Sequence, residues 1–95
     1  MAKLIWSPTA ISNLEDICNY IEVDSEQYAV LFAQNIIALI EDISKFPNAG
    51  RVVPEYSQDN LREKIYHSYR IVYRIKPEII EIVAIVHGAR LLHEI

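Results

Sequence analysis

The sequence contains little cysteine, little glycine and no long hydrophobic run. Its single cysteine, Cys18, excludes an internal disulfide and a cysteine-rich zinc site. Its two glycines leave no room for a phosphate-binding loop or a dinucleotide fingerprint, so no cofactor is expected. The longest apolar stretch, 29–43, is interrupted by polar residues and is too short to span a membrane. The N-terminal residues do not resemble a signal peptide, so we expect a cytoplasmic protein.

The chain does have enough apolar residues to fold. Of its 95 residues, 52% are hydrophobic and 23% are charged, which is typical of one globular domain over residues 1–95. A core of this size gives limited stability, so a protein partner or a homodimer is expected. The net charge of −4 argues against a protein that coats nucleic acid non-specifically.

The charge is unevenly distributed along the chain. Residues 1–46 hold two basic and seven acidic residues, a net charge of −5. Residues 47–95 hold seven basic and six acidic residues, a net charge of +1, and include all five arginines. Residues that bind or act on an anion are therefore expected in the second half of the chain.

The first half predicts a strand followed by two helices. Residues 3–6 are apolar and predict an edge or end strand. Ser7 and Pro8 suit the cap and the first position of a helix that runs to about Val23. The spacing of Asp24 and Gln27 suggests a capping box for a second helix, which ends near Phe46. The short break between them predicts an antiparallel helical hairpin.

The second half predicts strands after a connector at 47–60. The strands are expected at 61–67, 69–76 and 79–86, with a turn at 77–78. Strict alternation places Tyr69, Ile71, Tyr73 and Ile75 on one face of the second strand and Arg70, Val72, Arg74 and Lys76 on the other. The predicted fold is α+β: a strand, a helical hairpin, and an antiparallel β-meander with the hairpin packed on one sheet face.

The predicted packing leaves the arginine face of the sheet open. Arg70, Arg74 and Lys76 are therefore candidates to face a target. A two-residue turn at 77–78 places Arg70 opposite Ile85, and His87 then shares the face of Arg70. On the second helix, Leu31, Ile37 and Leu39 widen the apolar stripe beyond one narrow face.

Four ordered motifs resemble a known family. They are Phe46-Pro47-x-x-Gly50-Arg51-x-x-Pro54-Glu55, Leu61-Arg62-Glu63, Tyr69-Arg70-Ile71-Val72-Tyr73 and Val86-His87-x-x-Arg90. Together they resemble the RelE/ParE superfamily of type II toxin–antitoxin toxins, which include plasmid stabilisation proteins. The Gly-Arg-x-x-Pro-Glu and Leu-Arg-Glu segments are most similar to the ParE branch.

The resemblance implies a cytoplasmic toxin that a cognate antitoxin neutralises. The candidates to bind the antitoxin are then the apolar residues Leu31, Ile37 and Leu39 of the second helix, the alternative being that they are core residues. ParE-like members poison DNA gyrase, whereas RelE- and YoeB-like members cut mRNA on the ribosome. A third alternative is an inactive toxin fold that only binds a partner. Antitoxins of such systems usually carry the DNA-binding domain, so the resemblance implies no autonomous DNA binding by this chain.

A ribonuclease of the RelE kind needs a base, a cation for the phosphate and an acid. The resemblance makes Arg70 the candidate cation, and the alternative is a sheet-face arginine paired with a carboxylate. Glu55 resembles the YoeB-type base, although the same Pro-Glu pair occurs in ParE-like connectors. Arg90 resembles a late RelE arginine, the alternative being a surface arginine. His87 is a candidate acid because its pKa is naturally near neutrality, or it is structural.

Two departures from the RelE pattern make a ribonuclease less favoured. The catalytic lysines of the preceding RelE strand are replaced by Leu61 and Glu63, and the segment after Arg90 lacks the late tyrosine. The three histidines have no His-Glu-x-x-His spacing, so no metal is expected. The sequence therefore favours a ParE-like toxin that inhibits gyrase without being an enzyme, with an mRNA endoribonuclease as the alternative.

Overall fold

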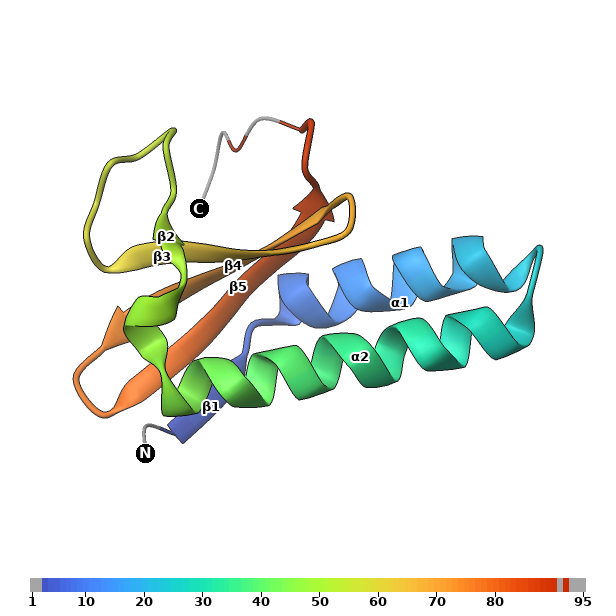
Figure 1. The fold of residues 1–95 in the computed structure, drawn as a ribbon, viewed down its shortest axis with the longest axis horizontal. Helices are drawn as coiled ribbons and strands as arrows, with labels where there is room; N and C mark the ends of the chain where they lie inside the picture. The colour runs from blue at the N-terminus through green and yellow to red at the C-terminus, as the bar shows by residue number, and fades with distance from the viewer. Residues whose placement is uncertain (1–2, 91, 93–95) are drawn as a thin grey trace.

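The computed structural model describes residues 3–90 and Leu92 (Figure 1). Along the chain lie β1 (Lys3–Trp6), α1 (Pro8–Glu22), α2 (Glu26–Lys45), the short 3₁₀ helix η1 (Pro47–Ala49), β2 (Arg51–Val52), β3 (Leu61–Tyr66), β4 (Tyr69–Lys76) and β5 (Ile79–His87). The predicted fold class is confirmed, because the hairpin of α1 and α2 packs on one face of the sheet. Over the described residues, no helix is long and apolar enough to cross a membrane.

Serine side chains cap both helices. The Ser7 Oγ accepts a hydrogen bond from the backbone N–H of Ala10 at 3.0 Å, with Pro8 at the first helical position as predicted. The cap of α2 is Ser25, whose Oγ accepts the N–H of Tyr28 at 3.1 Å. The capping box predicted at Asp24 is therefore wrong by one residue.

The sheet is mixed, with strand order β1-β5-β4-β3-β2. Strands β3, β4 and β5 form the predicted antiparallel meander. At one edge, β1 pairs parallel with β5, with Lys3 opposite Ile79. At the other edge, β2 pairs with β3 inside the segment predicted to be a connector. The N-terminal strand thus joins the strand that lies farthest from it in sequence.

A β-bulge in β5 changes the register that the sequence predicted. Val72 lies opposite Ala84 but Tyr73 lies opposite Ile82, so Val83 is the extra residue. Ser7 forms two hydrogen bonds with the bulge: its N–H donates to Ile82 O and its Oγ donates to Val83 O, both at 2.9 Å. The bulge therefore anchors the start of α1 on β5.

The main core lies between the hairpin and the sheet. Its buried side chains are Ala10, Phe32, Ile36, Ile40, Ile43, Ile71, Tyr73, Ile80, Ile82 and Ile85. Tyr69 and Ile75 pack against this core, which confirms the face assigned to β4. The buried Tyr73 hydroxyl donates to Pro47 O at 2.6 Å and accepts the N–H of Gly50 at 3.1 Å. A side chain on Gly50 would collide with this hydroxyl, which explains the glycine.

A second, smaller core covers the opposite face of the sheet. It is made of Val53, Leu61, Val72, Ala84 and Leu92. Leu61, Val72 and Ala84 come from the meander, Val53 from the segment after β2, and Leu92 from the segment after β5. Two segments distant in sequence therefore meet on this face, away from the hairpin (Figure 1).

Candidate functional site

Beside the second core lies a cluster of four charged side chains. Arg70 of β4 is 5% exposed and Glu63 of β3 is 1% exposed. The Arg70 Nε donates to Glu63 Oε1 at 2.6 Å, and its two terminal nitrogens donate to the two oxygens of Glu55 at 2.7 Å each. Arg51 of β2 completes the cluster, because its Nε lies 2.5 Å from Glu63 Oε2. Two carboxylates are therefore matched by two guanidinium groups.

The pairing of the strands explains why these side chains meet. Glu63 lies opposite Arg51 in β2 and opposite Val72 in β4, and Arg70 lies two residues before Val72 on the same face. Glu55 follows Pro54, just after the buried Val53, and reaches the cluster from the connector. A fully buried carboxylate requires such partners, since an unpaired charge at this depth would be strongly destabilising.

The same cluster binds the backbone that follows β5. Arg70 Nη1 donates to the carbonyl oxygen of Arg90 at 3.2 Å. Glu55 Oε2 accepts the backbone N–H of Leu92, also at 3.2 Å. Every nitrogen of the Arg70 guanidinium thus has an acceptor, and the pair of Arg70 and Glu55 holds the backbone groups of Arg90 and Leu92 at the cluster.

The electrostatics of the cluster keep both partners charged. Hydrogen bonds from Arg70 lower the pKa of Glu55 from its ordinary 4.5 to about 2. The hydrogen bond to Glu55 in turn raises the pKa of Arg70 above its already high value. At neutral pH, Glu55 is an anion held bidentately by a cation, which makes it a weak proton acceptor.

The structure brings together two of the four candidate ribonuclease residues, Arg70 and Glu55. The open placement predicted for Arg70 is wrong; the alternative, a sheet-face arginine paired with a carboxylate, is confirmed. Arg90 contributes its backbone carbonyl to the cluster, while the residue is exposed. A catalytic role for any of these residues stays a prediction.

His87 does not join the cluster. Because of the bulge, Val86 rather than Ile85 lies opposite Arg70, and His87 lies opposite Tyr69. The His87 ring packs edge-on against the Tyr69 ring with 5.8 Å between centroids. The prediction that His87 shares a face with Arg70 is therefore wrong, since one extra residue in a strand reverses the faces beyond it.

The other cations predicted to face a target are more accessible than Arg70. Arg74 is half-buried, and Lys76 is exposed and lies 3.3 Å from Glu81 of β5. Their register opposite Glu81 and Ile79 is as predicted, because the bulge lies farther along the strand. These two side chains remain candidates for a target surface.

Sequence reasoning missed the roles of Glu63 and Arg51. Glu63 was considered only as the replacement of a RelE lysine. Glu63 lies two residues after Leu61 and therefore on the same face of the strand, which was a usable signal for an inward carboxylate. Arg51 had no such signal, because β2 lies in a segment that predicted no strand.

The outer face of α2 carries the candidate partner-binding residues. Leu31 and Ile37 are exposed, as expected for residues that receive a partner. Leu39 is half-buried and packs against the main core, which is closer to the alternative considered for it. Of the three residues, the structure thus leaves Leu31 and Ile37 accessible.

Comparisons with known proteins agree with the fold. Residues 4–92 match the model of a family described as the ParE toxin of the type II toxin–antitoxin system, parDE. No curated protein matches the chain. A solved structure described as the chromosomal ParDE toxin–antitoxin system from P. aeruginosa is similar, with a TM-score of 0.76 and 21% identity. The match covers 92% of this chain and 96% of that chain.

Proposed function

Because the chain belongs to the ParE toxin family of type II toxin–antitoxin systems, we propose that it inhibits DNA gyrase and is neutralised by a cognate antitoxin. The observation that supports inhibition without RNA cleavage is the mutual pairing of Arg70 and Glu55. A ribonuclease needs an arginine that can reach a phosphate and a base that can take a proton. Here Arg70 and Glu55 use their hydrogen-bonding groups on each other, so neither is available to a phosphate or a substrate proton. The toxin therefore binds its target rather than cutting RNA.

Purified gyrase and purified ribosomes together test this function. With gyrase, ATP and plasmid, we expect the protein to accumulate cleaved DNA and to reduce supercoiling. With ribosomes and mRNA, we expect no new 5′ ends by primer extension. Ribosome-dependent cuts with unaffected gyrase would overturn the proposal in favour of an mRNA endoribonuclease. Normal growth on induced expression without antitoxin would favour an inactive toxin fold.

We place the contact with gyrase at Arg74 and Lys76. Their positive charges suit an acidic surface or a DNA-bound enzyme, and neither lies in the buried cluster. The double variant Arg74→Ala/Lys76→Ala is expected to weaken gyrase inhibition several-fold. Lys45→Ala, at the end of α2, is the matched control that removes a cation from the hairpin. Equal inhibition by both variants would show that the contact with gyrase lies elsewhere on the chain.

We place the antitoxin contact on the outer face of α2. Leu31 and Ile37 are exposed and Leu39 is half-buried, on a helix whose other face lies in the main core. An apolar segment of the antitoxin that wraps around α2 would bury these side chains. Two copies of the chain would bury the same side chains without antitoxin, so light scattering is expected to show a concentration-dependent homodimer.

A pair of isoleucines with equal exposure tests this contact. Ile37 on α2 is 45% exposed and Ile11 on α1 is 47% exposed. In co-purification with the product of the neighbouring reading frame, Ile37→Asp is expected to lose the antitoxin and Ile11→Asp to keep it. Retention by both variants would exclude the exposed apolar residues of α2 as the contact.

A further inference from the structure

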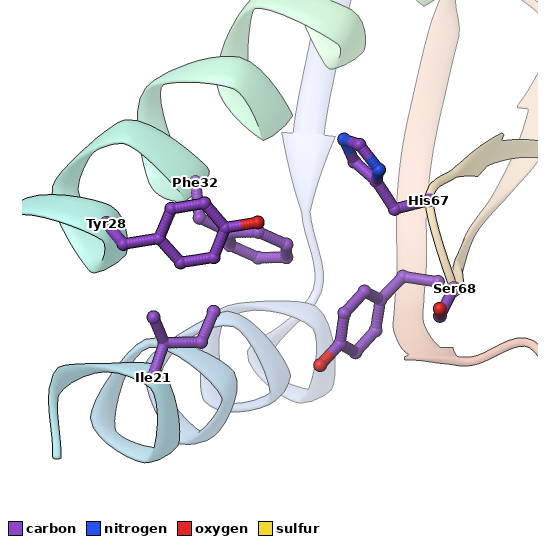
Figure 2. A pocket seen from close by; sticks show the side chains of 6 residues that line it. Ile21, Tyr28, Phe32, His67 and Ser68 are labelled. Carbon is purple, nitrogen blue, oxygen red and sulfur yellow. The ribbon is translucent and has the colours of Figure 1, made fainter. Parts of the chain in front are cut away.

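A pocket of about 320 Å³ lies where the tip of the helical hairpin faces the turn between β3 and β4 (Figure 2). Its lining residues are Ile21 of α1, Tyr28 and Phe32 of α2, His67 and Ser68 of the turn, and Tyr69 of β4. The pocket lining shares no residue with the charged cluster or with the residues assigned to gyrase and antitoxin, and its Tyr28 lies about one helical turn before Leu31. An inference about it therefore does not depend on the proposed function.

Aromatic rings form most of the pocket wall and hold one another in place. The buried Phe32 ring packs edge-on against Tyr69 at 5.3 Å and against Tyr66 at 5.7 Å between centroids. The Tyr66 ring is 4.4 Å from the His67 ring. Tyr28 lies opposite the turn and is half exposed (Figure 2). Such a set of preformed rings attracts a cation, because the face of an aromatic ring carries negative charge.

The helical hairpin that forms one side of the pocket is acidic. No lysine or arginine occurs between Lys3 and Lys45, whereas seven acidic residues do. Three of them, Glu22, Asp24 and Glu26, lie at the hairpin tip and are exposed. The last turn of α1 has no basic residue to offset its partial negative charge, while Glu26 offsets the positive start of α2. The tip is therefore complementary to a cationic ligand.

We propose that this pocket binds the arginine side chain of a basic segment on a protein partner. A planar guanidinium stacks on tyrosine and phenylalanine rings and still donates hydrogen bonds at its edge. The Ser68 hydroxyl on the pocket wall supplies an acceptor for those donors, and the carboxylates of the hairpin tip attract the positive charge at longer range. The aliphatic part of the side chain packs against Ile21.

A nuclear magnetic resonance titration with short peptides tests the site. The probe is acetyl-Gly-Arg-Gly-amide, and the controls carry citrulline, a neutral analogue of the same shape, or norleucine. The arginine peptide is expected to produce saturable shifts of the Tyr28, Phe32 and Tyr69 ring signals, with millimolar affinity and roughly tenfold weaker binding of both controls. Added salt is expected to weaken only the arginine peptide.

Two exposed tyrosines provide a matched pair of variants. Tyr28 lines the pocket and is 53% exposed, whereas Tyr20 lies on α1 outside the lining and is 78% exposed. Tyr28→Ala is expected to weaken the arginine peptide at least several-fold, and Tyr20→Ala to leave it unchanged; neither change removes a core residue. The proposal is overturned if norleucine binds as well as arginine, if both variants behave alike, or if no shift saturates by about 50 mM peptide.

Discussion

The two faces of the sheet are covered in different ways. The face under the hairpin is closed by aliphatic and aromatic side chains of two helices adjacent in sequence. The opposite face combines a small apolar core with four charged side chains and is closed by two segments distant in sequence. Apolar packing has no direction and tolerates adjustment, whereas a buried ion pair needs its specific partner. The two faces should therefore respond differently to mutation, pH and salt.

The largest effect is expected from removing the central cation. Arg70→Ala leaves Glu63 buried with one partner fewer, which is expected to lower the free energy of unfolding by about 3–5 kcal/mol in urea titrations. Arg74→Ala, on the same strand and face but half-buried, is the control and is expected to cost below about 1 kcal/mol. Equal losses would show that burial of Glu63 is not what makes Arg70 necessary.

On the hairpin face, a comparable loss in the free energy of unfolding requires a substitution that leaves a large cavity in the core. Ile40→Ala, at a side chain 1% exposed, is expected to cost about 2–4 kcal/mol. The exposed Ile37→Ala should cost less than about 1 kcal/mol. The Ile40 loss is expected to be the same in low and high salt, because it contains no charge interaction. A strong salt dependence at Ile40 would contradict the comparison.

A smaller cost is expected where the segment after β5 covers the second core. Leu92→Ala is expected to lower the free energy of unfolding by about 2 kcal/mol, since it empties part of a core with few members. The amide of residue 92 should also exchange with solvent faster by hydrogen-exchange measurement. Unchanged exchange would mean that Glu55 alone holds this backbone.

The smallest effect is expected on the pH dependence of stability in the acid range. The pKa of Glu55 is lower in the folded chain, about 2 against an ordinary 4.5. Its stabilising contribution is therefore complete above pH 4.5 and is lost as the pH falls toward about 2. In urea titrations between these values, Glu55→Gln is expected to flatten the pH dependence of stability. A slope identical to that of the parent chain would show that Arg70 does not need this carboxylate.

The helices and the central strand could be predicted because their signals are local. Pro8 after Ser7, helical spacing of apolar residues, and strict alternation in 69–76 each lie within a few residues of the structure that they specify. The parallel pairing of β1 and the bulge at Val83 have no such local signal. Both depend on Ser7 meeting residues of β5, an arrangement that only the complete sheet provides.

Only part of the charged cluster could be predicted, because only part of its signal is local. Alternation correctly placed Arg70 on the face away from the hairpin. Its burial could not be read from β4, because the groups that cover it come from β3, the connector and the segment after β5. The face of a strand is a local property, whereas its exposure depends on what the rest of the chain places over it.

The anchoring of α1 on the bulge also sets the order in which the chain can fold during synthesis. Strand β5 lies between β1 and β4, and Ser7 binds residues 82 and 83. A chain that leaves the ribosome N-terminus first can form its helical hairpin early, but β1 has no neighbour until β5 has emerged. The native sheet therefore assembles late, which keeps the nascent toxin incomplete until nearly all of the described residues have been made.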